Sequence, residues 1–282
     1  MNAKSINTLS DGTLHRPRRR FGQHFLQDGN VIDRLIGAID PKTSEHFAEI
    51  GPGLGALTMA MLAHIDRLDV IEIDRDIIPL LIRRCASLGH LIVHEADALT
   101  FDFTKLCENT SEHGSEGQNK HPDKLRVIGN LPYNISTPLI FHLLSQANCI
   151  QDMFFMLQKE VVDRITASPG GADYGRLSIM VQYRCDARFV FEVGPESFDP
   201  PPKVDSAIVH LVPYTKLPLA AINEDIFERI VRQAFSQRRK MLRNCLKSFI
   251  SEEKLSSIGI DPLNRPEQLS IADFVKISDA LI

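Results

Sequence analysis

Short apolar runs alternate with segments of helical periodicity through much of the chain. The runs that predict strands are 47–50, 68–73, 91–94, 125–128, 153–157 and 207–212, and the segments that predict helices are 56–65, 77–86 and 138–144. Strands that alternate with crossover helices form parallel βαβ units. We therefore predict an α/β fold with a Rossmann-like, doubly wound sheet, whose ligand lies at the carboxyl ends of the strands.

Composition narrows the class of protein further. The 282 residues are 43% hydrophobic and 24% charged, which is typical of a folded protein with a sizeable core. No uninterrupted apolar stretch approaches the roughly 18 residues of a membrane-spanning helix, so we expect no membrane partner. The five cysteines are widely spaced without a C-x-x-C pair, and the histidines form no H-E-x-x-H pattern. We expect a cytoplasmic protein with no disulfide framework and no metal, acting as a monomer.

Positive charge is concentrated in two regions, although the net charge is only -4. Residues 16–20 hold four arginines and no acid, and residues 226–247 hold seven Lys or Arg against the single acid Glu228. Such regions predict binding to a polyanion such as RNA, but they are also typical of a solvated surface. If 238–249 is helical, Arg239 and Arg243 share one face, while Met241, Leu242 and Cys245 face the core.

The same patterns divide the chain. We predict a basic tail over 1–17, a Rossmann-like domain over 18–213, and a helical, RNA-binding domain over 214–282, where apolar residues recur at helical spacing. The segment 107–124 has almost no apolar residue, and we predict that it is an exposed loop.

Gly51 and Gly53 lie in the turn between the first predicted strand and its helix, where glycine lets the backbone approach a ligand closely. Glu72 ends the next strand, and a carboxylate there accepts hydrogen bonds from both hydroxyls of a ribose. Asp97 follows the third strand, where it can accept from an adenine amino group. Together these residues predict a nucleoside site. Because Gly51, Gly53 and Ala56 also fit the dinucleotide template, an NAD enzyme remains an alternative.

The tetrapeptide Asn130, Leu131, Pro132 and Tyr133 follows the fourth strand. A proline-stiffened turn can direct the asparagine oxygen and a backbone carbonyl at one exocyclic amine, while the aromatic ring stacks on the base. Hydrogen bonds accepted from that amine favour the tetrahedral nitrogen of a methyl-transfer transition state. The pattern therefore predicts methyl transfer to a purine amino group. The alternative is a structural turn with a core tyrosine.

Five segments occur together in one order along the chain. They are FGQHFL at 21–26, EIGPG at 49–53, VIEID at 70–74, GNLPYN at 129–134 and FDPPPKV at 198–204. In this combination they resemble the ribosomal RNA adenine dimethyltransferases, specifically the small-subunit type, from about Arg18 to the last predicted helix.

The resemblance implies an S-adenosylmethionine-dependent enzyme that converts two adjacent adenosines near the 3′ end of small-subunit (16S) rRNA to N6,N6-dimethyladenosine. The implied substrate is an immature 30S-type subunit during ribosome biogenesis. Two alternatives stay open: a large-subunit (23S) rRNA adenine dimethyltransferase of the resistance type, and a small-subunit assembly factor without catalysis.

The resemblance also implies roles for individual residues. The implied cofactor contacts are His24, Leu26, Gly51, Gly53, Glu72, Asp97 and Asn130. The implied catalytic residues are Asn130, Leu131, Pro132, Tyr133 and Phe198. Phe198 would sandwich the flipped adenine against Tyr133, and this stacking would offset the cost of unstacking the base. Without the resemblance, Phe198 is equally typical of a core aromatic.

Overall fold

The computed structural model describes residues 7–8, 14–15, 24–108, 124–237 and 240–282. Several predicted features lie outside the described residues. They are the arginine run at 16–20, residues 21–23 of the FGQHFL segment, Arg239, and residues 109–123 of the predicted loop. Two-residue strands β1 (Asn7–Thr8) and β2 (Leu14–His15) pair antiparallel.

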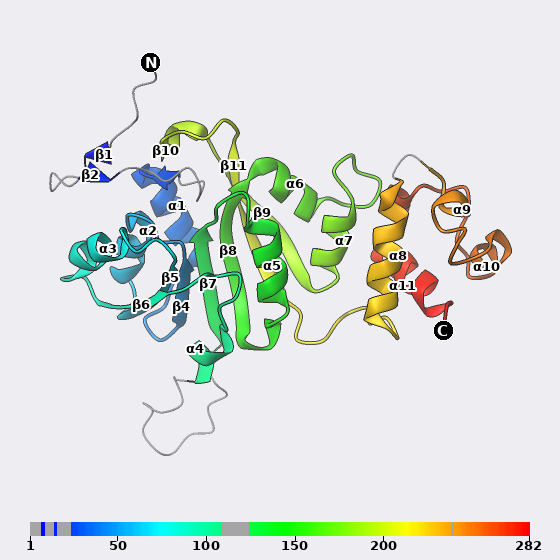
Figure 1. Ribbon diagram of the computed structural model, residues 1–282, viewed down its shortest axis with the longest axis horizontal. Coiled ribbons are helices and arrows are strands. Elements are labelled where there is room, and N and C mark those ends of the chain that lie inside the picture. The colour runs from blue at the N-terminus through cyan, green and yellow to red at the C-terminus, as the bar shows by residue number, and fades with distance from the viewer. Residues whose placement is uncertain (1–6, 9–13, 16–23, 109–123, 238–239) are drawn as a thin grey trace. The chain divides into compact units, whose positions relative to one another are not determined.

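A seven-stranded sheet forms the centre of the first part of the chain, in the order β6-β5-β4-β7-β8-β11-β9 (Figure 1). Its strands are β4 (His46–Ile50), β5 (Arg67–Glu72), β6 (His90–Glu95), β7 (Leu125–Asn130), β8 (Ile150–Gln158), β9 (Cys185–Val193) and β11 (Ser206–Pro213). The pairs β4/β5, β5/β6, β4/β7 and β7/β8 are parallel, and β11 is antiparallel to β8. The predicted α/β fold with a doubly wound sheet is confirmed.

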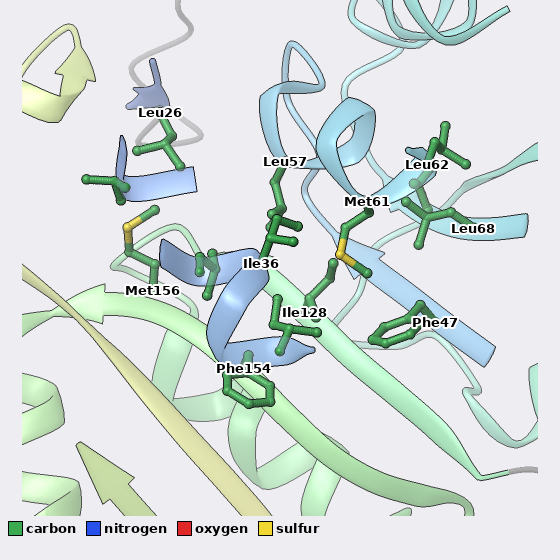
Figure 2. Packing of buried hydrophobic residues seen from close by; sticks show 14 of the residues in the cluster. Leu26, Ile36, Phe47, Leu57, Met61, Leu62, Leu68, Ile128, Phe154 and Met156 are labelled. Atoms are coloured by element: carbon green, nitrogen blue, oxygen red, sulfur yellow. The ribbon is translucent and has the colours of Figure 1, made fainter. Parts of the chain in front are cut away.

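Helices connect the parallel strands. They are α2 (Ala56–Leu62), α3 (Ile78–Cys85), α4 (Thr104–Glu108) and α5 (Ser136–Leu144), and α1 (Gly29–Ile39) precedes β4. Figure 2 shows Ile36 of α1 and Leu57 and Met61 of α2 packed among Phe47 of β4 and Ile128 of β7. All five side chains are at most 9% exposed, so this apolar layer holds α1 and α2 against β4 and β7.

Two short strands form a separate two-stranded sheet. β3 (Phe25–Leu26) and β10 (Phe198–Asp199) pair antiparallel, with Phe198 opposite Leu26. This pairing places residues 25–26 of the FGQHFL segment beside residues 198–199 of the FDPPPKV segment, although the two segments lie far apart in sequence.

The chain divides into two compact units, 1–159 with 188–213 and 160–187 with 214–282. The second unit therefore includes 160–187, which our predicted boundaries assigned to the Rossmann-like domain. Its helices are α6 (Lys159–Thr166), α7 (Arg176–Gln182), α8 (Glu224–Ser236), α9 (Leu242–Cys245), α10 (Glu252–Ser257) and α11 (Ile271–Asp279). The functional division into tail, catalytic domain and RNA-binding domain stays a prediction.

Two local predictions are wrong. Met241 caps α9 in an extended conformation (ψ 155°) and is 38% exposed, so it does not face the core, and Arg243 lies in a helix that begins only at Leu242. Cys107 belongs to α4 rather than to an exposed loop. It is 7% exposed, and its thiol donates to the carbonyl of Cys149 at 3.4 Å. In both cases tertiary packing overrides the local pattern.

The described residues contain no helix with the length and apolar character needed to cross a membrane.

Candidate functional site

A cavity of ≈ 210 Å³ lies at the carboxyl ends of β4, β5, β6 and β7. The loops after these strands line it together with residues 24–26. Ten of the site residues expected from the sequence meet there: His24, Leu26, Gly51, Gly53, Glu72, Asp97, Asn130, Leu131, Pro132 and Tyr133. The cavity is therefore where a doubly wound sheet is expected to bind its ligand.

The glycine turn lets the backbone form one wall of the cavity. Gly51 and Gly53 have φ of 64° and 55°, which is the left-handed region that side chains disfavour. A Cβ on Gly53 would lie 3.0 Å from the ring of Phe25. The amide of Gly51 donates to the carbonyl of Ile71 at 2.9 Å, which ties the turn to β5.

Glu72 ends β5 and is 6% exposed. Its Oε1 accepts a hydrogen bond from the amide of Asp74 at 2.8 Å. Burial raises the pKa of this carboxyl, while N–H groups of Asp74, Gly53 and Ile73 act in the opposite direction. These amides orient the carboxylate at the cavity wall, where ribose hydroxyls can donate to it. Beyond β6, Asp97 is exposed and accepts from the amide of Leu99 at 2.9 Å.

Asn130 ends β7, and its Nδ2 donates to the backbone carbonyl of His24 at 2.9 Å. A carbonyl can only accept, so this bond fixes which end of the carboxamide is nitrogen. The oxygen Oδ1 is consequently left to accept hydrogen bonds from a ligand. The next residue, Leu131, donates its amide to the carbonyl of Met156 at 3.1 Å, which holds the turn to β8.

Tyr133 is fixed on two sides. Its hydroxyl hydrogen-bonds the hydroxyl of Ser206 at 2.8 Å, and Ser206 is fully buried. The ring of His24 stacks on the Tyr133 ring with centroids 5.8 Å apart and planes at 23°. The Nδ1 of His24 lies 2.7 Å from the carbonyl of Pro200 and must donate there. The proline-rich segment thus positions His24, which in turn packs on Tyr133.

Phe198 does not join these residues. It is 4% exposed, does not line the cavity, and packs in the apolar core with Leu26 and Ile36. The expected adenine sandwich between Phe198 and Tyr133 stays a prediction, because in this arrangement the Phe198 ring lies in the core and not in the cavity lining. The physical reason is the pairing of β10 with β3, which directs the Phe198 ring into the core.

Sequence reasoning did not select Glu49, which the structure places in the cavity lining. This residue is 2% exposed and accepts a hydrogen bond from the Thr58 hydroxyl at 2.6 Å. Burial raises the pKa of Glu49 to about 8. Its position near the end of a strand, one residue before Ile50 and the glycine turn that follows, was the available signal. Within the described ranges, no group of three or more His, Cys, Asp or Glu side chains is arranged to hold a metal ion.

A family model described as ribosomal RNA adenine dimethylase matches residues 14–282. The chain is 54% identical over 273 residues to the ribosomal RNA small subunit methyltransferase A of Pseudomonas syringae pv. tomato, covering 97% of both chains. It is 54% identical over 266 residues to the protein of the same name from Alcanivorax borkumensis, covering 94% of this chain and 90% of the relative.

Two solved structures have similar folds. The dimethyladenosine transferase from Plasmodium falciparum is 28% identical, and the two structures align with a TM-score of 0.74. The alignment covers 90% of this chain and 96% of that chain. The 23S rRNA methyltransferase ErmE is 23% identical, with a TM-score of 0.68 over 91% of this chain and 99% of that chain. At this identity the second likeness concerns the fold alone.

Proposed function

The chain belongs to the ribosomal RNA adenine dimethylase family, and on this premise we propose that it dimethylates the N6 amino groups of two adjacent adenosines near the 3′ end of small-subunit (16S) rRNA, with S-adenosylmethionine as donor. The observation that carries the proposal is the Asn130 carboxamide, whose nitrogen is committed to His24 while its oxygen is left for an amine. This geometry supports transfer to an amino nitrogen.

The residues of the cavity suit S-adenosylmethionine. Glu72 can accept from both ribose hydroxyls, Asp97 can accept from the adenine amine, and the turn at Gly51 allows close backbone approach. When bound, the cofactor supplies an activated methyl group on a positively charged sulfur. The other expected contacts, His24, Leu26, Gly53 and Asn130, also line the cavity.

Asn130 acts on the accepting amine. The lone pair of an adenine amine is delocalised into the ring, and it becomes available as the nitrogen turns tetrahedral. A hydrogen bond from the amine to Oδ1 of Asn130 strengthens during that change, so it lowers the barrier more than it tightens binding. Leu131 and Pro132 hold the turn, and the Tyr133 ring provides the stacking face for the base.

The packing of His24 restricts how a base can stack. With ring centroids 5.8 Å apart, no base fits between His24 and Tyr133. An adenine that stacks on Tyr133 must use the other face of the ring or displace the His24 ring. Phe198 would have to leave the core before it could form a second wall.

We also propose the finer features of the reaction. The substrate is an immature 30S-type subunit, and the enzyme acts as a monomer in the cytoplasm. Its five cysteines are all buried and suit a reducing compartment. Arg243 lies in the region expected to bind RNA. Its Nη1 is 3.7 Å from Oε2 of Glu252, and both side chains are exposed. Such an exposed ion pair is too weak to prevent Arg243 from contacting a phosphate.

The substrate can be tested against its alternatives. Purified protein should methylate small subunits isolated from cells that lack it, and should methylate naked large-subunit RNA little. The two relatives whose names specify the small subunit support this preference for small-subunit RNA. Mass spectrometry of both RNAs after incubation measures the products. Preferential modification of large-subunit RNA would support the resistance-type alternative, and absence of methyl incorporation would support a non-catalytic assembly factor.

Replacing Glu72 with alanine should weaken S-adenosylmethionine binding by roughly ten to a hundredfold, about 1.5 to 3 kcal/mol, because a buried acceptor of two hydroxyls is lost. Titration calorimetry measures the change. The same measurement with NAD and wild-type protein tests the dinucleotide alternative. Unchanged affinity in the variant, or tight NAD binding by the wild type, would contradict the nucleoside assignment.

A further inference from the structure

Ser206 is a buried hydroxyl group in contact with the candidate site, and the proposed chemistry has not used it. It begins β11, two residues after the FDPPPKV segment ends. Its side chain is fully buried and does not line the cavity. A ligand in the cavity therefore cannot touch Ser206, so any effect of this residue on the reaction must pass through a neighbour.

That neighbour is Tyr133. A hydroxyl that is buried without a hydrogen bond destabilises the fold, and within the described residues the Ser206 hydroxyl bonds the hydroxyl of Tyr133 at 2.8 Å. The next residues of β11, Ala207, Ile208 and Val209, are apolar and fully buried. A small apolar residue would therefore suit the packing at position 206 as well as serine does. What serine adds is the hydrogen bond to Tyr133.

This hydrogen bond restrains the far end of a side chain that lines the cavity. The backbone end of Tyr133 is already held, because its carbonyl accepts from the hydroxyl of Ser136 at 3.2 Å, and Ser136 is 2% exposed. A tyrosine side chain that is held only at its backbone still turns about two torsions. Anchoring the hydroxyl fixes the direction of the ring axis, so the remaining freedom is the tilt of the ring about that axis.

The restraint on the tilt comes from the same part of the chain. The His24 ring stacks on the Tyr133 ring with the planes at 23°, and Nδ1 of His24 donates to the carbonyl of Pro200 at 2.7 Å. Pro200 precedes Ser206 by six residues. One short segment thus holds Tyr133 directly at its hydroxyl and, through His24, at one face of its ring.

We propose that Ser206 is a positioning residue for methyl transfer: its hydrogen bond to the Tyr133 hydroxyl aligns the ring on which the target adenine stacks. The inference rests on the proposed function, because it assumes a base stacked on Tyr133. A misplacement of about 1 Å can cost roughly 10²-fold in rate, so a lost anchor slows the reaction although Ser206 never meets the substrate. The Tyr133 hydroxyl is committed to Ser206 and transfers no proton in the reaction.

A double-variant cycle tests the coupling of the two hydroxyls. Tyr133→Phe keeps the ring and removes its hydroxyl, and Ser206→Ala removes the partner. Each variant should transfer methyl groups about tenfold more slowly on bound RNA, because each loses the same anchor. The double variant should also be about tenfold slower, not roughly a hundredfold slower. Single-turnover kinetics with saturating small subunits measure the rates. Affinity for the subunits should change by less than about threefold, because the stacking face remains.

Ser278→Ala is the matched control for the loss of a buried hydroxyl. Ser278 belongs to the second compact unit, is fully buried, and donates to the carbonyl of Val275 at 2.8 Å. This variant should lower the melting temperature about as much as Ser206→Ala does, and it should keep the wild-type rate. Calorimetry should give the wild-type affinity for S-adenosylmethionine in every variant, because Tyr133 and Ser206 are not among the expected cofactor contacts.

Two results would contradict the positioning role. A wild-type rate in Ser206→Ala, with only a lower melting temperature, would make Ser206 a structural residue. Additive losses in the double variant, or a loss in Tyr133→Phe that Ser206→Ala does not share, would show that the two hydroxyls act separately.

If Ser206→Ala does not fold, Tyr133→Phe decides the question, because it leaves Ser206 in place. A rate about tenfold lower at every pH supports the anchor, whereas a wild-type rate or an altered pH dependence overturns it. A wild-type protein that binds S-adenosylmethionine but transfers no methyl group to RNA would instead overturn the proposed function.

Discussion

Replacing Asn130 with alanine is expected to lower the rate of methyl transfer on bound RNA by about 10² to 10³, while RNA affinity changes far less. The Nδ2 of Asn130 is held by the His24 carbonyl at 2.9 Å, so Oδ1 is oriented before substrate arrives. Because this oxygen interacts most strongly with the tetrahedral nitrogen, its loss belongs mainly to the transition state. Single-turnover kinetics with saturating small subunits measure the rate separately from binding.

A matched control makes this experiment specific. Asn148 is an exposed asparagine outside the cavity lining, and Asn148→Ala removes the same group without touching the site. The control should keep the wild-type rate. If Asn130→Ala retained the rate on bound RNA and lost only affinity, the carboxamide would be a binding contact and the transition-state role would be wrong.

The sequence was sufficient to predict the strands that hold the cavity. β4, β5 and β7 are almost entirely buried, so each appears as a mostly apolar run, within which Glu49, Asp69 and Arg126 are buried charged residues. The predicted and observed strand ends differ by a few residues at most. Because ligand-binding residues of such a sheet follow the strands directly, the strand assignment also located Glu72, Asp97 and Asn130.

The edge of the sheet was harder to predict. β9 alternates buried, intermediate and exposed residues and includes Asp186, Arg188 and Glu192, so it lacks the apolar run of a central strand. The segment 160–187 has helices that belong to the second compact unit, a grouping that depends on contacts with residues distant in sequence. Local periodicity contains no information on such contacts.

Phe198 and Glu49 show that local sequence also fails to predict how individual side chains are placed. The sequence around Phe198 fits a stacking residue and a core residue equally well, and only the register of β10 with Leu26 decides between them. The motif around Glu49 shows a carboxyl at a strand end. It does not show that Thr58 of α2 donates a hydrogen bond to this carboxyl, or that burial raises its pKa.

Removing the Arg126 side chain is expected to produce the largest loss of stability, about 3 to 5 kcal/mol in the free energy of unfolding for Arg126→Ala. Arg126 is 6% exposed. Its Nε and Nη2 donate to the two carboxylate oxygens of Asp152 at 2.8 and 2.9 Å, and its Nη1 donates to Glu45 at 2.8 Å. Without the guanidinium, Asp152 is left as a buried charge with only His210 beside it. Urea unfolding at pH 7 measures the loss.

The pH dependence and a double variant test this explanation. Burial acts to raise the pKa of Asp152, but hydrogen bonds from His210 and Arg126 more than offset it, so the pKa lies below the ordinary 3.8. The stabilisation by this pair is therefore present above pH 3.8 and is lost as pH falls through the folded value. Arg126→Met combined with Asp152→Leu should lose much less stability than Arg126→Ala, because no unpaired charge remains in the core. If the single and double variants are equally destabilised, the cost comes from lost packing against Phe47, over whose ring the guanidinium lies at 4.9 Å, and not from the uncompensated carboxylate.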